Sequence, residues 1–490
     1  MTAAQPTPQP AGVDEESSRL LARRVPSLDR TFPRDFVWGV ATSSYQIEGA
    51  VDEDGRGASI WDTFSAVPGA TVNGDTGAVA VDHYHRWAED LDLMAWLGVD
   101  AYRFSIAWPR IVPDASGQVN QAGLDFYRRL VDGMLERGIE PSATLYHWDL
   151  PQWLQDRGGW AARSTVDAFV DYAATVTEAL GTVTMWATHN EPWCAAFLGH
   201  GDGEHAPGIR DDDTAVAACH HLLLSHGRAI EVMRDVAGHE RDEPAQLGIV
   251  LNIATVTTTG TTAADHEAVR FVDGGRNRAW LDPLFRGAYP DDVLADWAPV
   301  ADLSVIRDGD LDMISQPLDW LGINFYHPLW VAAGEGSAPE PGTMGVAAAP
   351  PPGPRTAMDW PIEASGLADI VHRVVDDYGS MPIFITENGG AFPDNTVVAG
   401  LDGAAAAPVI DDQDRIAYLS DHLQVAHDLV AAGIDLRGYF AWSLLDNFEW
   451  AWGYGMRFGI VHVDYDTLVR TPKASAHFFR RVIADSNSGD

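Results

Sequence analysis

The chain has 490 residues, and its 71 acidic residues against 32 basic ones give a formal net charge of −39. Such a charge repels nucleic acid and anionic membrane surfaces, so both are excluded as partners. No run approaches the roughly 18 consecutive apolar residues of a membrane span, and none is predicted.

Residues 1–30 are rich in Pro, Gln, Ala and charged residues and lack an apolar stretch of signal-peptide length. This composition predicts a flexible N-terminal tail over residues 1–30 and a single domain over residues 31–485. The only cysteines are Cys194 and Cys219, which gives no disulfide framework and fits a reducing compartment. We therefore expect a cytoplasmic protein.

Eight short apolar runs predict buried strands, and amphipathic helical patterns separate many of them. Repeated alternation of strand and helix requires a parallel sheet, and eight units match a single (β/α)8 TIM barrel of the α/β class better than an open sheet. The first strand is not followed by a phosphate-binding glycine fingerprint, which weakens the dinucleotide-binding alternative. The predicted strands are Phe36–Thr42, Ala101–Ile106, Ser142–Tyr146, Thr184–Thr188, Leu247–Asn252, Trp320–Asn324, Ile383–Thr386 and Gly438–Trp442. The predicted helices include His83–Leu97, Leu124–Leu135, Val166–Leu180, Ala215–Val232 and Arg415–Leu429.

Two long irregular segments interrupt this alternation late in the chain. Ala332–Pro361 follows the sixth predicted strand and Ala391–Ile410 follows the seventh. Loops of this length in a compact domain are usually functional rims or disordered insertions. We expect them at the catalytic face of the barrel, where they would shape the site of the leaving group.

Two glutamates stand at the ends of predicted strands: Glu191 in THNEP (residues 188–192) and Glu387 in ITENG (residues 385–389). Two facing carboxyl groups are the minimal machinery for cleaving a glycosidic bond, because one protonates the leaving oxygen and the other meets the positive charge at the anomeric carbon. A single strand-end glutamate is more often solvated or salt-bridged, so the hypothesis depends on the surrounding residues.

Polar and aromatic residues gather at the ends of seven predicted strands. Active sites of (β/α)8 barrels form at the carboxyl ends of the strands, so this convergence predicts one shared site. The 18 tryptophans favour carbohydrate, because an indole covers the apolar face of a sugar, although at least half of them are expected in the core. The gathered residues are Gln46, Arg103, His147, Trp148, Asn190, Glu191, Asn324, Tyr326, Glu387, Glu449 and Trp450.

From roughly Phe32 to Phe479 the chain resembles glycoside hydrolase family 1, the retaining β-glucosidases and their relatives. Besides the two glutamate motifs, the resemblance rests on FVWGVATSSYQIEG (36–49), YRFS (102–105), LYHWDLP (145–151), GINFY (322–326) and NFEW (447–450). It implies a (β/α)8 barrel with Glu191 as general acid/base and Glu387 as nucleophile.

The same resemblance implies the roles of the neighbouring residues. Asn190 would hold the sugar 2-hydroxyl, Trp442 would lie beneath the ring, and Arg103 and Tyr326 would contact Glu387 and keep it ionised. The approach of Glu387 is expected to raise the pKa of Glu191. The remaining implied substrate-binding residues are Gln46, His147, Trp148, Asn324, Tyr326, Glu449 and Trp450.

The leading hypothesis is a retaining β-glucosidase that releases terminal non-reducing β-linked glucose from small glycosides, with cellobiose among its substrates, through a covalent glycosyl-enzyme intermediate. One alternative is a 6-phospho-β-glycosidase, which the carboxylate of Glu449 and the absence of Lys from that motif disfavour. The other is an inactive sugar-binding protein on the same scaffold. The preferred glycone stays open between gluco, galacto and fuco configurations.

Beyond a small β-glycoside the sequence indicates no further ligand: neither a cofactor nor a metal is expected, and a homo-oligomer is compatible with it. The histidines do not form a metal-ligand set at helical spacing. Two residues in or just after the first glutamate motif leave alternatives. His189 is either a packed core histidine or a modifier of Glu191, and Cys194 is either a buried inert thiol or part of the cleft.

Overall fold

The computed structural model describes residues 25–28, 30–238, 240, 244–334, 339–394, 397–398 and 409–488. Most of the predicted N-terminal tail and much of segment 391–410 lie outside these residues. Among the helices described, none is long and apolar enough to cross a membrane.

Eight parallel strands close into a barrel in the order β1-β13-β10-β7-β5-β4-β3-β2, as the sequence predicts. The strands are buried on both faces, because the helices cover the outside of the barrel, and this explains their continuous apolar runs. They are β1 (Val37–Ala41), β2 (Ala101–Ser105), β3 (Glu140–Tyr146), β4 (Met185–Asn190), β5 (Gln246–Leu251), β7 (Trp320–Asn324), β10 (Ile383–Asn388) and β13 (Leu436–Trp442).

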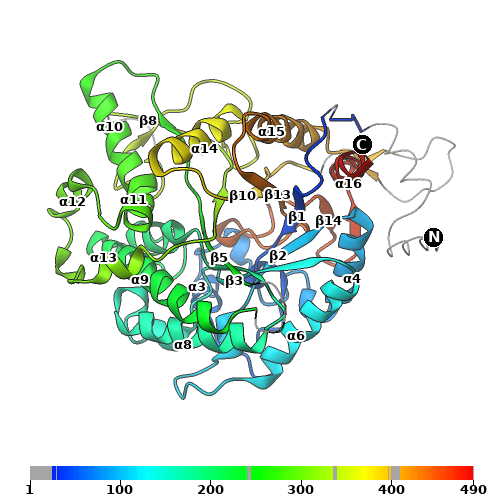
Figure 1. The fold of residues 1–490 in the computed structure, drawn as a ribbon, viewed down its shortest axis with the longest axis horizontal. Helices are drawn as coiled ribbons and strands as arrows, with labels where there is room; N and C mark the ends of the chain where they lie inside the picture. The colour runs from blue at the N-terminus through cyan, green and yellow to red at the C-terminus, as the bar shows by residue number, and fades with distance from the viewer. Residues whose placement is uncertain are drawn as a thin grey trace.

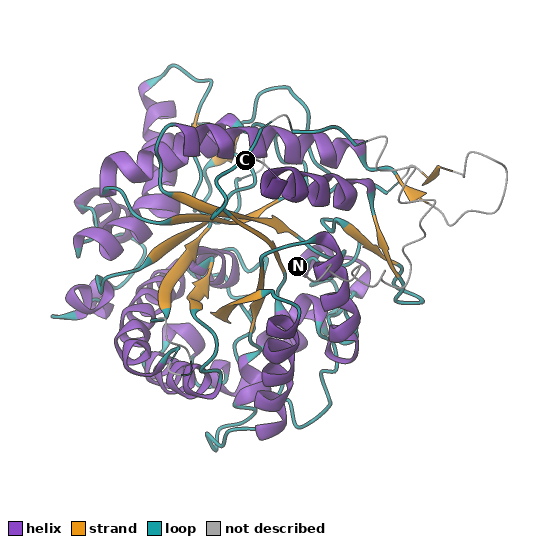
Figure 2. Cartoon of the chain, turned by 45° about the vertical axis from the view of Figure 1, so that its right-hand side comes forward, coloured by secondary structure: helices purple, strands orange, loops and turns teal. Residues whose placement is uncertain are grey.

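Long helices surround the barrel (Figures 1 and 2). Side-chain caps fix several of their starts: Asn120 accepts a hydrogen bond from the backbone N–H of Ala122, and Asp211 accepts one from Thr214. The longer helices are α4 (His83–Leu97), α6 (Gln121–Glu136), α8 (Ser164–Ala179), α9 (Asp212–Val236), α10 (Ala263–Asp273), α11 (Ala279–Arg286), α14 (Ser365–Tyr378), α15 (Gln413–Ala431) and α16 (Ala474–Ser488).

Short elements decorate the loops between these strands and helices. The short helices are α2 (Ser44–Ile47), α3 (Ile60–Ser65), α5 (Trp108–Ile111), α7 (Gln152–Gln155), α12 (Asp291–Trp297), α13 (Asp310–Ile314), η1 (Val72–Gly74), η2 (Gly159–Ala161), η5 (Leu303–Val305) and η6 (Trp450–Trp452), with π-helical η3 (Cys194–Gly201) and η4 (Gly274–Arg278). The short strands are β6 (Val256–Thr257), β8 (Leu329–Ala332), β9 (Ala347–Ala348), β11 (Val397–Val398), β12 (Val409–Ile410), β14 (Val461–Val463) and β15 (Arg470–Pro472).

Segment 332–361 is less irregular than its composition suggests. β8 pairs with β6 and with β9, and these short strands form a separate three-stranded sheet. This pairing fixes the start and the middle of the segment, and most of its residues that line the cavity described below follow β9.

At their carboxyl ends, β4 and β10 extend further than their apolar runs predict, and both extensions reach the polar residues of the site. β4 continues to Asn190, which pairs with Val250 after a register shift. β10 continues to Asn388, and Glu387 pairs with Asn324 after a second register shift. Such irregularities re-aim side chains at the rim of a barrel. Polar residues thus occupy strand positions that hydrophobic periodicity alone does not identify.

Candidate active site

A cavity of about 470 Å³ opens at the carboxyl ends of the barrel strands and contains both glutamates. Most residues predicted from the sequence line its wall, whereas Gln46 and Arg103 lie behind it and bond to residues that do. The predicted residues on the wall are His147, Trp148, Asn190, Glu191, Asn324, Tyr326, Glu387, Trp442, Glu449 and Trp450.

The carboxyl group of Glu387 is held at both oxygens. Arg103 Nη1 donates to Oε1 over 2.6 Å, and the Tyr326 hydroxyl donates to Oε2 over 2.6 Å. Gly389 lets the end of β10 approach β13 closely, because a Cβ at that position would lie only 1.8 Å from the carbonyl oxygen of Trp442. The side chain of Glu387 is therefore fixed from three directions at the centre of the barrel mouth.

Glu191 follows β4 directly and has a different set of partners. Asn324 Nδ2 donates to Oε1 over 2.6 Å, and the Cys194 thiol donates to Oε2 over 3.1 Å. The backbone of Glu191 has a φ of 45°, a left-handed conformation that costs a non-glycine residue about 1–3 kcal/mol. Trp148 and Trp450 share this feature, with φ of 73° and 48°. Left-handed backbone conformations thus occur at three residues whose side chains line the cavity.

Asn190 links the two glutamates. Its Oδ1 accepts hydrogen bonds from Arg103 Nη2 over 2.6 Å and from Asn324 Nδ2 over 2.9 Å. Asn324 in turn donates to Glu191, and its Oδ1 accepts from Thr386. Because these partners fix which end of each amide is oxygen, the second N–H of Asn190 remains available for a ligand.

His147 is oriented by the same asparagine. Asn190 Nδ2 can only donate, so His147 Nε2 accepts at 3.0 Å and the ring proton stays on Nδ1. Nδ1 is buried and has no hydrogen-bond partner within the described chain. Burial, together with Arg103, holds the pKa of His147 well below its ordinary value, so the ring is neutral.

The two glutamates lie in different electrostatic surroundings. Burial raises the pKa of Glu191, and the hydrogen bonds from Asn324 and Cys194 partly oppose the rise. Burial also raises the pKa of Glu387 and Glu191 adds to this, whereas the charge of Arg103 lowers it, as does the Tyr326 hydroxyl. Burial is therefore a larger cause of the raised pKa of Glu191 than the approach of Glu387, on which the expectation rested.

Glu449 forms another acidic wall. Its Oε2 accepts a hydrogen bond from Gln46 Nε2 over 3.3 Å, and Gln46 also donates to the side chain of Asn447 over 3.0 Å. Burial, with Glu387 and Glu191 nearby, raises the pKa of Glu449 to about 8. Aromatic rings frame this side of the cavity: Trp148 and Trp450 lie 4.6 Å apart, and the ring of His147 stacks 5.9 Å from Trp442.

The outer cavity contains residues that the sequence did not identify as part of the site. Arg276, in η4, lies with its guanidinium carbon 3.7 Å from the centre of the Trp193 ring. Nothing in its motif indicates a cavity position, because it reaches the site through the π-helical turn after α10. Trp193 could have been found, since it lies two residues after Glu191, and Cys194 lines the wall, as one of its two alternatives allowed. Other wall residues outside the predicted set include Glu204, Asn252, Trp330, Glu340 and Arg355.

His189 packs in the core. Its Nε2 lies 2.8 Å from the Ser225 hydroxyl, and its ring stacks on Phe169 at 4.5 Å. Burial holds the pKa of His189 well below its ordinary value. This environment fits the packed histidine of the two alternatives.

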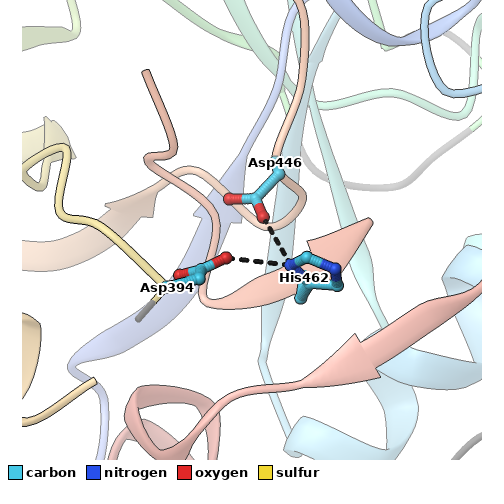
Figure 3. Close-up of side chains that lie close together, drawn as sticks. All are labelled: Asp394, Asp446 and His462. Atoms are coloured by element: carbon cyan, nitrogen blue, oxygen red, sulfur yellow. Dashed lines mark hydrogen bonds and ion pairs between the residues drawn. The ribbon is translucent and has the colours of Figure 1, made fainter. Parts of the chain in front are cut away.

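Outside the cavity, Asp394, Asp446 and His462 lie close enough together to form a potential three-ligand metal set (Figure 3). Lys473 Nζ lies 2.8 Å from Asp394 and 2.9 Å from Asp446, and Arg457 lies 2.7 Å from Asp446. These cations already neutralise the carboxylates, and a metal ion would have to displace them. The cluster is best described as an ion-pair network that ties the segment after β10 to the C-terminal part of the chain.

Comparison with known proteins places this site in context. The sequence profile of glycosyl hydrolase family 1 matches residues 28–488. A bifunctional β-D-glucosidase/β-D-fucosidase of Bifidobacterium breve is 46% identical over 93% of this chain and 99% of the relative. β-Glucosidase A of Acetivibrio thermocellus is 45% identical over 93% of this chain and 99% of the relative. The structure of a family 1 β-glucosidase from Thermotoga maritima superimposes with a TM-score of 0.86 at 43% identity and covers 94% of this chain and 100% of that one.

Proposed function

The chain belongs to glycosyl hydrolase family 1, and we propose that it is a retaining β-glucosidase that releases terminal β-linked glucose from small glycosides. The roles of the two glutamates are assigned from the contrast between their hydrogen-bond partners. Glu387 is bonded to a cation and a phenol, whereas Glu191 is bonded to an amide and a thiol. When the two carboxyl groups hold one proton between them, these partners favour the anion at Glu387 and leave the proton on Glu191.

Two displacements follow from these roles. Glu387 attacks the anomeric carbon while Glu191 passes its proton to the glycosidic oxygen, so the leaving group departs as a neutral alcohol. Water then attacks the same carbon, Glu191 takes the proton of the water, and the bond between sugar and Glu387 breaks. Free glucose and the starting enzyme result, and the configuration at the anomeric carbon is retained.

The rest of the wall supports glucose as the group that is cleaved off. The free N–H of Asn190 is a donor for hydroxyls, His147 lies beside it on the same wall, and Glu449 is an acceptor positioned by Gln46. Trp442 supplies a flat apolar surface for the ring. We assign the leaving-group side to Trp193, Arg276 and Trp330, which extend the cavity outward.

The alternatives have less support. A 6-phosphoglycoside would bring a dianion to the wall formed by Glu449, where residues 447–454 supply neither Lys nor Arg to hold a phosphate, and this disfavours a phosphoglycosidase. An inactive binding protein would not require two glutamates held in contrasting environments at one cavity. We further propose a cytoplasmic location, cellobiose as a substrate and residues 31–485 as one catalytic domain. The two cysteines are buried and unpaired, which supports a reducing compartment.

A trapping experiment tests the function and the roles together. Incubation with 2,4-dinitrophenyl 2-deoxy-2-fluoro-β-glucoside should yield one covalent adduct, located by mass spectrometry on the peptide that contains Glu387. The first sugar released from a β-glucoside, observed by NMR, should be the β-anomer. Initial release of the α-anomer would establish inversion and remove Glu387 from its role. No turnover of any neutral nitrophenyl β-glycoside would overturn the proposed enzyme.

A further inference from the structure

Cys194 is the first residue of η3 and lies one turn after Glu191 along the chain. Its backbone N–H donates to the carbonyl oxygen of Glu191 over 2.9 Å, which places the two side chains on the same side of this turn. The thiol reaches Glu191 Oε2 over 3.1 Å and lines the cavity. A buried and inert thiol, the simpler expectation from the sequence, does not account for this contact.

A third residue orients the thiol. Asn252, directly after β5, donates through Nδ2 to Cys194 Sγ over 3.1 Å. Because Sγ accepts the hydrogen bond from Asn252, the thiol hydrogen of Cys194 is donated to Glu191. The amide of Asn252 thus donates to the thiol, and the thiol donates to the carboxyl group. Burial raises the pKa of the Cys194 thiol well above its ordinary value, and the group remains S–H and able to donate.

The opposite oxygen of Glu191 has its own donor. Asn324 holds Oε1, so each carboxyl oxygen receives one hydrogen bond from the protein. Donors to a carboxyl group stabilise its anion more than its neutral form. A thiol is a weaker donor than a hydroxyl or a guanidinium, and it favours the anion without removing the acid.

We propose that Cys194, oriented by Asn252, is a positioning residue that holds Glu191 Oε2 and sets how readily Glu191 changes from acid to base. The inference rests on the proposed acid/base role of Glu191. In the first displacement Glu191 loses its proton, and the thiol stabilises the carboxylate that forms. In the second displacement the carboxylate of Glu191 takes a proton from the attacking water. The thiol holds this carboxylate in the position where the water arrives.

Other charged and titratable groups also face Glu191, from several elements. They act on its pKa through the cavity and are unchanged by substitutions at residue 194, so a comparison of variants at this position isolates the thiol. These groups are Arg103 on β2, Arg276 in η4, Tyr326 after β7, Glu387 on β10 and Glu449 before η6.

The test compares Cys194→Ala and Cys194→Ser with Cys219→Ala, in which the other buried cysteine, on α9 and outside the cavity wall, is truncated. In Cys194→Ala the anion of Glu191 has lost a hydrogen-bond donor, so the pKa of Glu191 should rise. The decline of kcat/KM at high pH, which is the basic limb of the pH profile for a nitrophenyl glucoside, should therefore move to higher pH. With dinitrophenyl glucoside, kcat should fall about 3- to 10-fold, the effect of one hydrogen bond of ordinary net strength, because a thiol is a weak donor. Its kcat/KM should change less than about 2-fold, since this leaving group needs no proton.

Further comparisons separate positioning from a merely structural role. Reactivation of the 2-fluoroglucosyl enzyme by water should slow in Cys194→Ala, and Cys194→Ser, with a hydroxyl donor, should restore both this rate and the basic limb. Cys219→Ala should change neither. Asn252→Ala should have little effect on the limb once Cys194 is alanine, because the two residues act in series.

An unchanged basic limb and an unchanged reactivation rate in Cys194→Ala would overturn the inference. So would equal losses in kcat and kcat/KM for dinitrophenyl glucoside, since a displaced scaffold impairs both steps. These results leave the proposed function intact, because that function depends on the adduct at Glu387 and on the anomer released.

Discussion

Arg103 forms a buried ion pair with Glu387, with Nη1 of the guanidinium 2.6 Å from Oε1 of the carboxylate. The same guanidinium donates through Nη2 to Asn190 Oδ1 over 2.6 Å. One cation on β2 thereby fixes a carboxylate on β10 and an amide on β4. This fork geometry is available to arginine and not to lysine, which carries a single point charge.

Arg103→Lys is expected to lower kcat/KM about 100-fold or more, because breaking a buried pair costs about 3–5 kcal/mol and one amine cannot hold both partners. The charge of Arg103 lowers the pKa of Glu387. Since Glu387, as the proposed nucleophile, must be ionised to attack, a weaker pair should move the acidic limb of the kcat/KM–pH profile to higher pH. Arg470→Lys is the control, because Arg470 pairs with Asp90 over 2.8 Å outside the cavity wall. Arg470→Lys should lower Tm without moving the acidic limb of the pH profile. An unmoved acidic limb in Arg103→Lys would contradict the role of Arg103 in keeping Glu387 ionised.

Glu191→Gln preserves the shape of the side chain and removes the proton donor. General acid catalysis contributes typically about 10² to 10⁴-fold, so kcat/KM for cellobiose should fall by that amount. Dinitrophenol leaves without a proton, and kcat/KM for its glucoside should fall far less. Steady-state kinetics on the two substrates checks this. Equal losses on both would leave Glu191 with a structural role only.

Glu449 makes stability depend on pH. Its pKa is raised from 4.5 to about 8, so the folded protein holds a proton that the unfolded chain releases near pH 4.5. Its contribution to the free energy of unfolding is fully present below pH 4.5 and is lost as pH rises through about 8. Glu449→Gln stays neutral, so its stability, measured by urea unfolding at pH 5, 7 and 9, should fall less with pH than that of the wild type. Glu178→Gln, at an exposed position on α8, should follow the wild type. Parallel curves for Glu449→Gln and the wild type would contradict this prediction.

Arg276 is expected to act on the leaving group and on Glu191 together. Its charge lowers the pKa of Glu191, so Arg276→Met should move the basic limb of kcat/KM to higher pH. The loss in kcat/KM should be several-fold greater for cellobiose than for nitrophenyl glucoside, because a second sugar offers hydroxyls to the guanidinium. Arg286→Met is the matched control, since Arg286 stacks on Tyr378 at 4.7 Å outside the cavity wall. Equal losses on the two substrates would remove Arg276 from the leaving-group site.

The sequence by itself determined the barrel and predicted many of the residues that line its cavity. Eight apolar runs with helical patterns between them predict all eight barrel strands, because strands buried on both faces must be continuously apolar. Glu191 and Glu387 could be identified because their motifs are local and stand at strand ends. The residues around them carried a family resemblance for the same reason.

The tertiary structure alone decided what depends on contacts between distant segments. The partners of Glu191 come from β7 and from the turn after β4, and the orientation of Cys194 depends on Asn252 after β5. Arg276 enters the cavity from the π-helical turn η4, which directly follows helix α10 and not one of the predicted strands. A thiol or a guanidinium has no periodic signature, and only closure of the barrel brings these groups to the same carboxyl group. Burial likewise raises the pKa of Glu191 and Glu449. The atoms that bury them come from many distant segments, so no single stretch of sequence predicts this shift.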